Sequence, residues 1–180
     1  MTDFEPIFRD ANARLSAEPR TAGKSVWSAD AGDRQFEVLE LAVTYAEDAG
    51  DEDAADLGRN AIVRDRVYAV DGKRVCWARS YLPAKLAEGT PIGGLNTGPG
   101  GVPARLAELG HELVSFSEDV EFVERENVTA DERDRLGIDD MTAVVRIVRR
   151  GIDASGQVVK VSDMRLVAGA YRFRWAWTNR

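Results

Sequence analysis

Cysteine and histidine are scarce in this sequence of 180 residues, which contains only Cys76 and His111. A single cysteine cannot form a disulfide within the chain. Chains without disulfides are typical of a reducing cytosol, so we expect a cytoplasmic protein. One histidine and one cysteine are also too few for a zinc site built from such ligands.

Long hydrophobic runs and positive charge are also lacking. No stretch is long and apolar enough to span a bilayer, and the N-terminus has no apolar run of the signal-peptide kind. The chain carries 31 acidic and 24 basic side chains, a formal net charge of −7. Binding to phosphate backbones needs concentrated lysine and arginine, so we expect neither a membrane partner nor direct binding of nucleic acid. The charge is unevenly distributed along the chain. The first 60 residues have six basic and 14 acidic side chains, whereas the last 40 residues have eight basic and two acidic side chains.

Sequence signatures of several enzyme classes are absent as well. The chain has no Gly-x-Ser-x-Gly elbow, no P-loop and no dinucleotide fingerprint. A catalytic triad would have to use His111, which we interpret instead as an ordinary residue at a helix-to-strand junction. The acidic run over residues 47–56 is either a solvated loop with a short helix near 53–57 or, less in keeping with calcium-loop spacing, a metal site. We expect no cofactor and no metal.

Segments rich in β-forming residues dominate what is present. We expect strands over residues 35–45, 61–70, 74–82, 112–125, 142–152, 157–167 and 170–178, with residues 1–34 extended and 84–99 loop-like. Asp71-Gly72 and Ser155-Gly156 predict tight hairpin turns. Short helices are expected over 102–109 and 129–136, the second opened by a capping box of Thr129 and Glu132. The pattern predicts an α+β fold, an antiparallel β-sheet with short helices on one side.

Two arginines lie on one face of the expected strand 61–70. Alternation places Arg64 and Arg66 together with Ile62, Tyr68 and Val70. A buried guanidinium is costly without a partner. Either this face is exposed to solvent, or the two arginines clamp a carboxylate or phosphate, for which the planar fork of arginine is suited.

Two further features are candidates for ligand contact. Gly100 and Gly101 precede a helix, where backbone N–H groups can bind an anion, although a flexible connector is the alternative. Tyr171 could reach a ligand with its hydroxyl, or it could be a buried sheet aromatic.

Several segments, taken in order and spacing, resemble one family. They are the hairpin 66–75 with the Ser-Tyr-Leu-Pro sequence of 80–83, the Asn-Thr-Gly-Pro-Gly-Gly sequence of 96–101 with 104–111, the helix start 129–132 with 136–138, and the strand pair within 153–173. Together they resemble the UTRA domain, the effector-sensing domain of GntR-type transcription regulators of the HutC subfamily. The resemblance covers roughly residues 23–177. We therefore divide the chain into an extended N-terminal segment or linker, 1–22, and a UTRA effector-binding domain, 23–180.

The resemblance implies a fold like that of chorismate lyase, a homodimer and a small anionic metabolite as effector, which would modulate DNA binding through the dimer. Regulators of this type bind DNA through a winged helix-turn-helix. Residues 1–22 are neither basic nor periodic enough for that module, so we expect DNA contact only through a module absent from this chain.

The resemblance also implies which residues meet the effector. The positions matching the family's pocket are Ser25, Trp27, Arg64, Arg66, Tyr68, Gly100, Gly101 and Tyr171. Some relatives have serine where Gly101 stands, so only backbone N–H groups would remain there. Some sugar-phosphate sensors have acids where this chain has Lys160 and Ala78, which argues against an amino-sugar effector.

An enzyme is the alternative hypothesis. A chorismate lyase-like protein would eliminate pyruvate from chorismate and would need a carboxylate for acid–base chemistry. Glu118 is the one acid that we can place on an otherwise apolar strand face. A shared fold does not by itself convey function, so we expect a sensor without catalytic residues.

Overall fold

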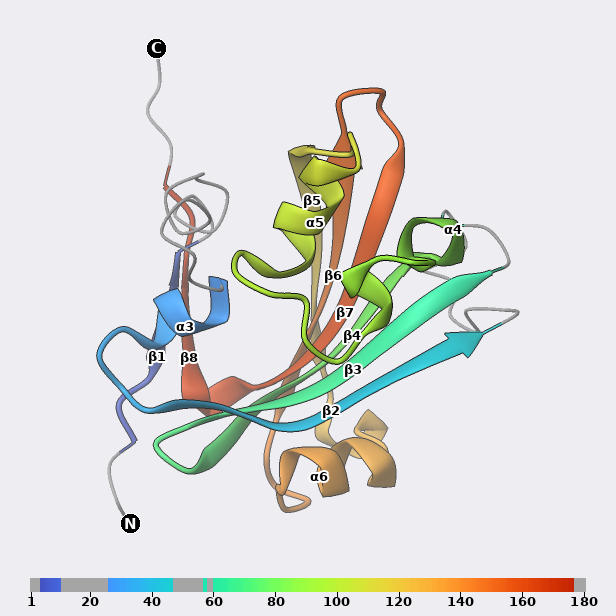
Figure 1. Ribbon diagram of the computed structural model, residues 1–180. Helices are drawn as coiled ribbons and strands as arrows, with labels where there is room; N and C mark the ends of the chain where they lie inside the picture. The colour runs from blue at the N-terminus through green and yellow to red at the C-terminus, as the bar shows by residue number, and fades with distance from the viewer. Residues whose placement is uncertain (1–3, 11–25, 47–56, 58–59, 177–180) are drawn as a thin grey trace.

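The computed structural model describes residues 4–10, 26–46, 57 and 60–176, which form an antiparallel six-stranded sheet and a separate two-stranded pair (Figure 1). The order in the large sheet is β2-β3-β4-β7-β6-β5. Its strands are β2 (Phe36–Ala46), β3 (Ala61–Val70), β4 (Lys73–Pro83), β5 (Leu113–Val123), β6 (Val144–Asp153) and β7 (Val158–Val167). The predicted α+β class with an antiparallel sheet and short helices is confirmed.

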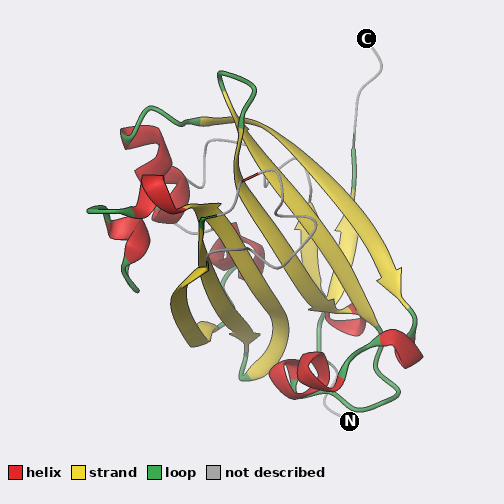
Figure 2. Cartoon of the chain, turned by 90° about the vertical axis from the view of Figure 1, so that its right-hand side faces the viewer, coloured by secondary structure: helices red, strands yellow, loops and turns green. Residues whose placement is uncertain are grey.

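Tight turns connect the central strands, as the sequence predicts. Asp71 and Gly72 join β3 to β4 with φ angles of 50° and 73°. Both residues therefore have the positive φ that a two-residue hairpin turn requires. Gly156, in the turn between β6 and β7, has a φ angle of 84°. The hairpins β3–β4 and β6–β7 meet through the antiparallel pairing of β4 with β7, and Figure 2 shows the strands as a twisted sheet.

A parallel strand pair lies beside this sheet. β1 (Ile7–Asp10) pairs with β8 (Tyr171–Arg174), so the two ends of the described chain meet (Figure 1). Ile7 is 4% exposed and belongs to the core. At least residues 4–10 of the segment predicted as an extended linker are thus packed against the rest of the chain. β8 ends at Arg174, earlier than the predicted strand 170–178.

Helices cover both faces of the large sheet, so the prediction of helices on one side is wrong. On the first face lie α3 (Val26–Ala31), α4 (Ala84–Ala87) and α5 (Gly101–Glu108). α6 (Ala130–Leu136) packs on the second face, where Glu132 accepts a hydrogen bond from Arg165 of β7 at 2.5 Å. Alternation puts Arg165 and Met164 on opposite faces of β7, and Met164 faces α3 and α5.

Two segments are more ordered than the sequence predicts. The expected loop 84–99 contains α4 and the 3-10 helix η2 (Pro91–Gly93), and α3 lies within the segment 1–34 that was expected to be extended. η2 begins with Pro91 at its first position, and the side chain of Thr90 accepts a hydrogen bond from Ile92 N at 3.3 Å. These are ordinary helix-start signals at the scale of one turn. The shortest helices η3 (Arg125–Asn127) and η4 (Ala168–Ala170) complete the list. The described helices are all too short or too polar to cross a membrane.

Candidate functional site

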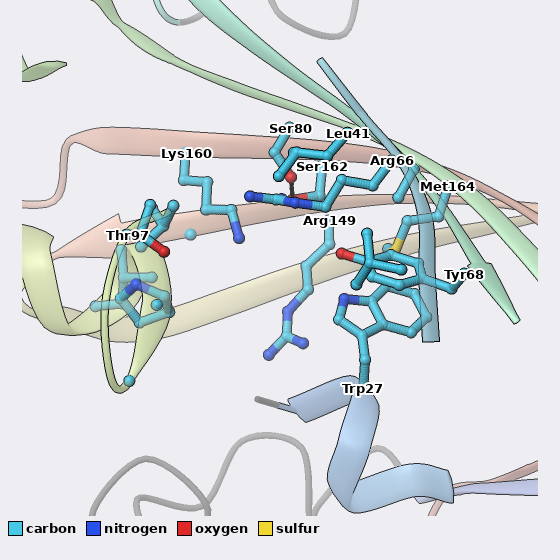
Figure 3. Close-up of a pocket in the computed structure, with 18 of the residues that line it drawn as sticks. Trp27, Leu41, Arg66, Tyr68, Ser80, Thr97, Arg149, Lys160, Ser162 and Met164 are labelled. Carbon is cyan, nitrogen blue, oxygen red and sulfur yellow. Dashed lines mark hydrogen bonds between the residues drawn. The ribbon is translucent and has the colours of Figure 1, made fainter. Parts of the chain in front are cut away.

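A cavity of about 360 Å³ lies between the first face of the sheet and the segment that precedes α5. Its floor follows the strand register: Arg66, Ala78 and Met164 form one row across β3, β4 and β7. The neighbouring row contains Ser80 and Ser162, whose Oγ atoms are 3.2 Å apart, and Arg149 of β6. The walls come from Trp27 of α3 and from residues 95–103, and all the residues drawn in Figure 3 line this cavity.

Three cationic side chains line the cavity, namely Arg66, Arg149 and Lys160. Figure 3 shows their nitrogen ends directed into the same space. No aspartate or glutamate is among the described residues that line it. The guanidinium of Arg149 lies 4.2 Å from the centre of the Phe116 ring, and its Nε is 3.7 Å from Glu118 Oε1. The described lining therefore contributes cationic side chains and no carboxylate, while Glu118 lies behind Arg149.

Arg66 is the cation whose situation is most unusual. Its side chain is half-buried, and within the described part of the chain it makes no hydrogen bond and no ion pair. Arg66 lies close enough to another cation, Arg64, to help lower the pKa of that guanidinium. A guanidinium in a concave site without a counterion is costly to the folded state, and such costs are typical of binding sites.

The other end of the cavity is aromatic and apolar. Trp27 and Tyr68 are stacked with ring centres 4.6 Å apart, and Phe36 stacks on Tyr68 at 5.6 Å. Met164 and Val38, which pairs with Tyr68 in the sheet, complete this end. The helix α3, which the sequence did not predict, holds Trp27 over the sheet (Figure 3).

Arg64 has a different place from Arg66, although both lie on the same face of β3. Its side chain is fully buried and does not line the cavity. Its Nη1 donates to the carbonyl oxygens of Ile92 and Gly94, each at 2.5 Å, and its Nη2 donates to that of Leu95 at 3.0 Å. Burial, with the nearby charge of Arg66, lowers its pKa to about 10, so it stays charged at neutral pH. Arg64 thus fixes the segment that forms the cavity wall.

The start of α5 also lines the cavity, at Gly100 and Gly101. Their φ angles of 76° and 64° are in the left-handed region, which favours glycine. The Gly101 N–H already donates to Gly98 O at 3.1 Å, and Pro103 has no N–H to donate. Two of the first three residues of α5 therefore offer no backbone donor, and side-chain cations carry most of the potential for anion binding.

The remaining sequence-predicted residues lie elsewhere. Tyr171 is 7% exposed, packs in the core and stacks on Phe173 at 6.1 Å between ring centres, and it does not line the cavity. Ser25 and the acidic run 47–56 are outside the described residues. Sequence reasoning did not select Arg149, Ser162 or Met164. A signal existed, because 160, 162 and 164 alternate on one face of a predicted strand.

His111 and Glu118 are engaged away from the cavity. His111 Nδ1 is 2.8 Å from Asp153 Oδ2, at the junction of α5 and β5. Hydrogen bonds from the Ser155 hydroxyl and from His111 hold the pKa of Asp153 well below its usual range. The Glu118 carboxylate accepts hydrogen bonds from both Nη atoms of Arg9, at 2.6 and 3.2 Å. Glu118 does not line the cavity, which removes the acid on which the enzyme hypothesis depended. Among the described residues, no group of three potential metal ligands occurs.

Solved structures share this fold. A structure assigned to a GntR-family transcriptional regulator matches with a TM-score of 0.70 and 22% identity, over 83% of this chain but 61% of that chain. PhnF from Mycobacterium smegmatis matches with a TM-score of 0.71 and 16% identity, over 97% of this chain and 73% of the PhnF chain. The effector domain of the same PhnF matches with a TM-score of 0.66 and 18% identity, over 86% of this chain and 93% of that domain. At such identities the likeness shows the fold.

The sequence itself shows the family. The UTRA domain model matches residues 32–172, most of the chain, whereas a comparison with the curated proteins found no match. The UTRA domain is a regulatory ligand-binding domain and not an enzyme. The fold, the cavity on the sheet and the sequence match agree, and the chain belongs to the UTRA domain family of effector domains of GntR-family transcription regulators.

Proposed function

We propose that this domain senses a small anionic metabolite, which binds in the cavity at Arg66. The observation that carries the proposal is the half-buried Arg66 guanidinium, which has no counterion among the described residues in an acid-free cavity. A bound carboxylate or phosphate would supply that counterion with a geometry that matches the guanidinium fork. The absence of acids from the described lining also disfavours an effector that carries an amine.

The proposed contacts divide among four kinds of residue. Arg66, with Arg149 and Lys160, neutralises the anion. Trp27 and Tyr68 pack against the rest of the ligand. Gly100 and Gly101 let the ligand approach the backbone closely. Ser25 and Arg64 stay effector residues suggested by the family resemblance, with Arg64 acting through the wall that it holds. The resemblance also suggests Tyr171, which lies in the core outside this cavity.

We also propose how the binding is transmitted. In a complete regulator of the HutC type, the domain would form a homodimer in the cytoplasm, and the effector would shift the equilibrium between two dimer arrangements. The shift would reposition a winged helix-turn-helix and so change DNA binding. Large exposed apolar side chains on the edge strands, such as Tyr45 and Phe122, support a partner surface. Light scattering that finds only monomers at all concentrations would exclude the dimer.

Native mass spectrometry and calorimetry together test the proposed site. We expect the purified chain to carry, or to bind from a pool of small organic acids and phosphate esters, an anionic ligand. Arg66→Ala should weaken that binding by about 1.5–3 kcal/mol, the range for hydrogen bonds to charged groups. Arg66→Lys should also weaken it, because the planar fork is lost. The control is Arg172→Ala, which removes an exposed arginine outside the cavity; equal affinity of Arg66→Ala and the control would place the ligand elsewhere.

A further inference from the structure

The cavity is polarised along the strands that form its floor. Lys160, Ser162 and Met164 follow one another on the same face of β7, and successive residues on one face lie about 6.7 Å apart. Lys160 and Ser162 bring polar groups to one part of the cavity, and Trp27, Tyr68 and Met164 bring aromatic and apolar groups to another. Arg66 shares a row of the sheet with Met164, but its guanidinium extends toward Lys160, where Phe116 and Leu113 also line the cavity. Figure 3 shows this division, with Lys160 and Arg66 on one side and Trp27, Tyr68 and Met164 on the other.

The apolar half offers few hydrogen-bonding groups. Its described side chains are Trp27, Phe36, Val38, Tyr68 and Met164, and only the Trp27 indole N–H and the Tyr68 hydroxyl among these are strong hydrogen-bonding groups. A hydroxyl-rich ligand body placed there would lose hydrogen bonds to water that the wall could not replace. A flat apolar body would instead gain contact with the stacked rings of Trp27 and Tyr68, 4.6 Å apart.

The basic half selects against cationic groups. Arg66, Arg149 and Lys160 share this space, and no acid lies among the described lining residues. An ammonium group on the ligand would lie next to the unpaired guanidinium of Arg66 and would find no acid among the described lining residues, which is unfavourable in a partly desolvated site.

From this polarity we infer the chemical class of the effector: an organic acid or phosphate ester whose anionic group is joined to a flat apolar or aromatic body, without an amino group. The inference rests on the proposed sensing function and narrows it. The anionic group lies at Arg66 and Arg149, and the body extends toward Met164, Tyr68 and Trp27.

A matched set of probes tests both halves on the full chain by titration calorimetry. The test ligand is 4-phenylbutyrate, whose three methylenes separate carboxylate and ring by about one row of the sheet, ~6.7 Å. Its partners are 4-phenylbutan-1-ol without the charge, 4-phenylbutylamine with the opposite charge, butyrate without the ring, and gluconate as a hydroxyl-rich acid. We expect 4-phenylbutyrate to bind at least tenfold more tightly than each of the four.

Three variants and one control assign the two halves of the cavity. Arg66→Gln should reduce the advantage of 4-phenylbutyrate over its alcohol to less than threefold and leave its advantage over butyrate. Val38→Asn, at an exposed edge-strand position beside Tyr68, should reduce the advantage over butyrate and leave the advantage over the alcohol. Trp27→Ala is a second variant for the apolar half, and Arg172→Ala is the control that should change neither ratio.

The outcomes separate the inference from the function on which it rests. If gluconate binds as tightly as 4-phenylbutyrate and depends on Arg66, the sensing function stands and the proposed ligand class is wrong. If the alcohol or the amine binds as tightly as the acid, the anionic half of the inference is wrong. If no acid binds and Arg66→Gln changes nothing, both the inference and the proposed function are overturned.

Discussion

Arg64 and Arg66 are two residues apart on one strand, yet their side chains have different partners. Strand alternation predicts that both lie on one face of β3, and the cost of burying a charge predicts that each needs a partner. The structure gives Arg64 three backbone carbonyls and leaves Arg66 in the cavity. Composition could not separate the two, because the carbonyl partners depend on the path of residues 92–95, which no local pattern specifies.

Substitution of the two arginines should therefore have different effects on the free energy of unfolding. Arg64→Gln would leave buried carbonyls without donors, and we expect the free energy of unfolding to fall by about 3 kcal/mol. Arg66→Gln removes a like charge beside Arg64, so its free energy of unfolding should equal or exceed that of the wild type. Urea denaturation of both variants measures this difference. A comparable loss in the two variants would show that Arg66 has a structural role.

The sequence predicts where helix α6 begins, but it does not predict which face of the sheet the helix covers. The capping box is present, since Thr129 Oγ1 accepts from Glu132 N at 3.2 Å and Glu132 Oε2 accepts from Thr129 N at 2.7 Å. Burial works to raise the pKa of Glu132, but the hydrogen bonds from Thr129 and Arg165 outweigh it and the pKa is lowered. The contact with Arg165 is long-range and joins α6 to the second face of the sheet.

Loss of the cap should be measurable at the scale of this helix. Thr129→Ala removes the acceptor for Glu132 N, and we expect it to lower the free energy of unfolding by about 1 kcal/mol. Thr129→Ser keeps the hydroxyl and should retain most of the stability. If chemical denaturation ranks serine with alanine, the hydroxyl does not cap the helix.

The hairpin end of β6 should give the domain a specific acid sensitivity. Asp153 accepts hydrogen bonds from Ser155 Oγ at 2.6 Å and lies 2.8 Å from His111 Nδ1. Its pKa is lower in the folded than in the unfolded state, so its stabilisation is fully present above about pH 4 and is lost as the pH falls further. Asp153→Asn should be less stable than the wild type at pH 7, and the difference should shrink between about pH 4 and pH 2. Melting temperatures across this range that stay parallel would contradict this assignment.

At the scale of the whole molecule, the N-terminal strand is connected to the cavity. Arg9 of β1 is 1% exposed and holds Glu118 of β5 with both Nη atoms. Glu118 in turn lies 3.7 Å from Arg149, which lines the cavity. The sequence predicted an extended N-terminal segment, but this pairing joins positions 109 residues apart and could not be read from local pattern.

Removing Arg9 should therefore affect the cavity as well as stability. Arg9→Met leaves a largely buried carboxylate with less positive charge nearby, and we expect a loss of about 3 kcal/mol in the free energy of unfolding. The carboxylate should then hold Arg149 more strongly, so that affinity for 4-phenylbutyrate falls. The double variant Arg9→Met/Glu118→Gln should recover part of both losses, and a double-mutant cycle measures this coupling. Additive effects of the two substitutions would mean that Arg9 does not act on the cavity through Glu118.

Much of the fold was predictable because it depends on local signals. Asp71-Gly72 and the alternation of β3 and β4 specify a hairpin, and the order of hairpins specifies an antiparallel sheet. The site was predictable only in part, since Arg149 and Lys160 reach the same space as Arg66 through the pairing of β4, β7 and β6. That pairing is a property of the assembled sheet.

The most direct test of the central claim is a two-dimensional ¹H–¹⁵N NMR spectrum of the full chain with and without a pool of small organic acids and phosphate esters. Gly98, Gly100, Gly101 and Gly151 line the cavity and report on it through their amides. We predict that the resonances of these amides shift in the wild type when the pool is added, and that they do not shift in Arg66→Gln. An unchanged wild-type spectrum, or equal shifts in the variant, would contradict an anion-sensing cavity at Arg66.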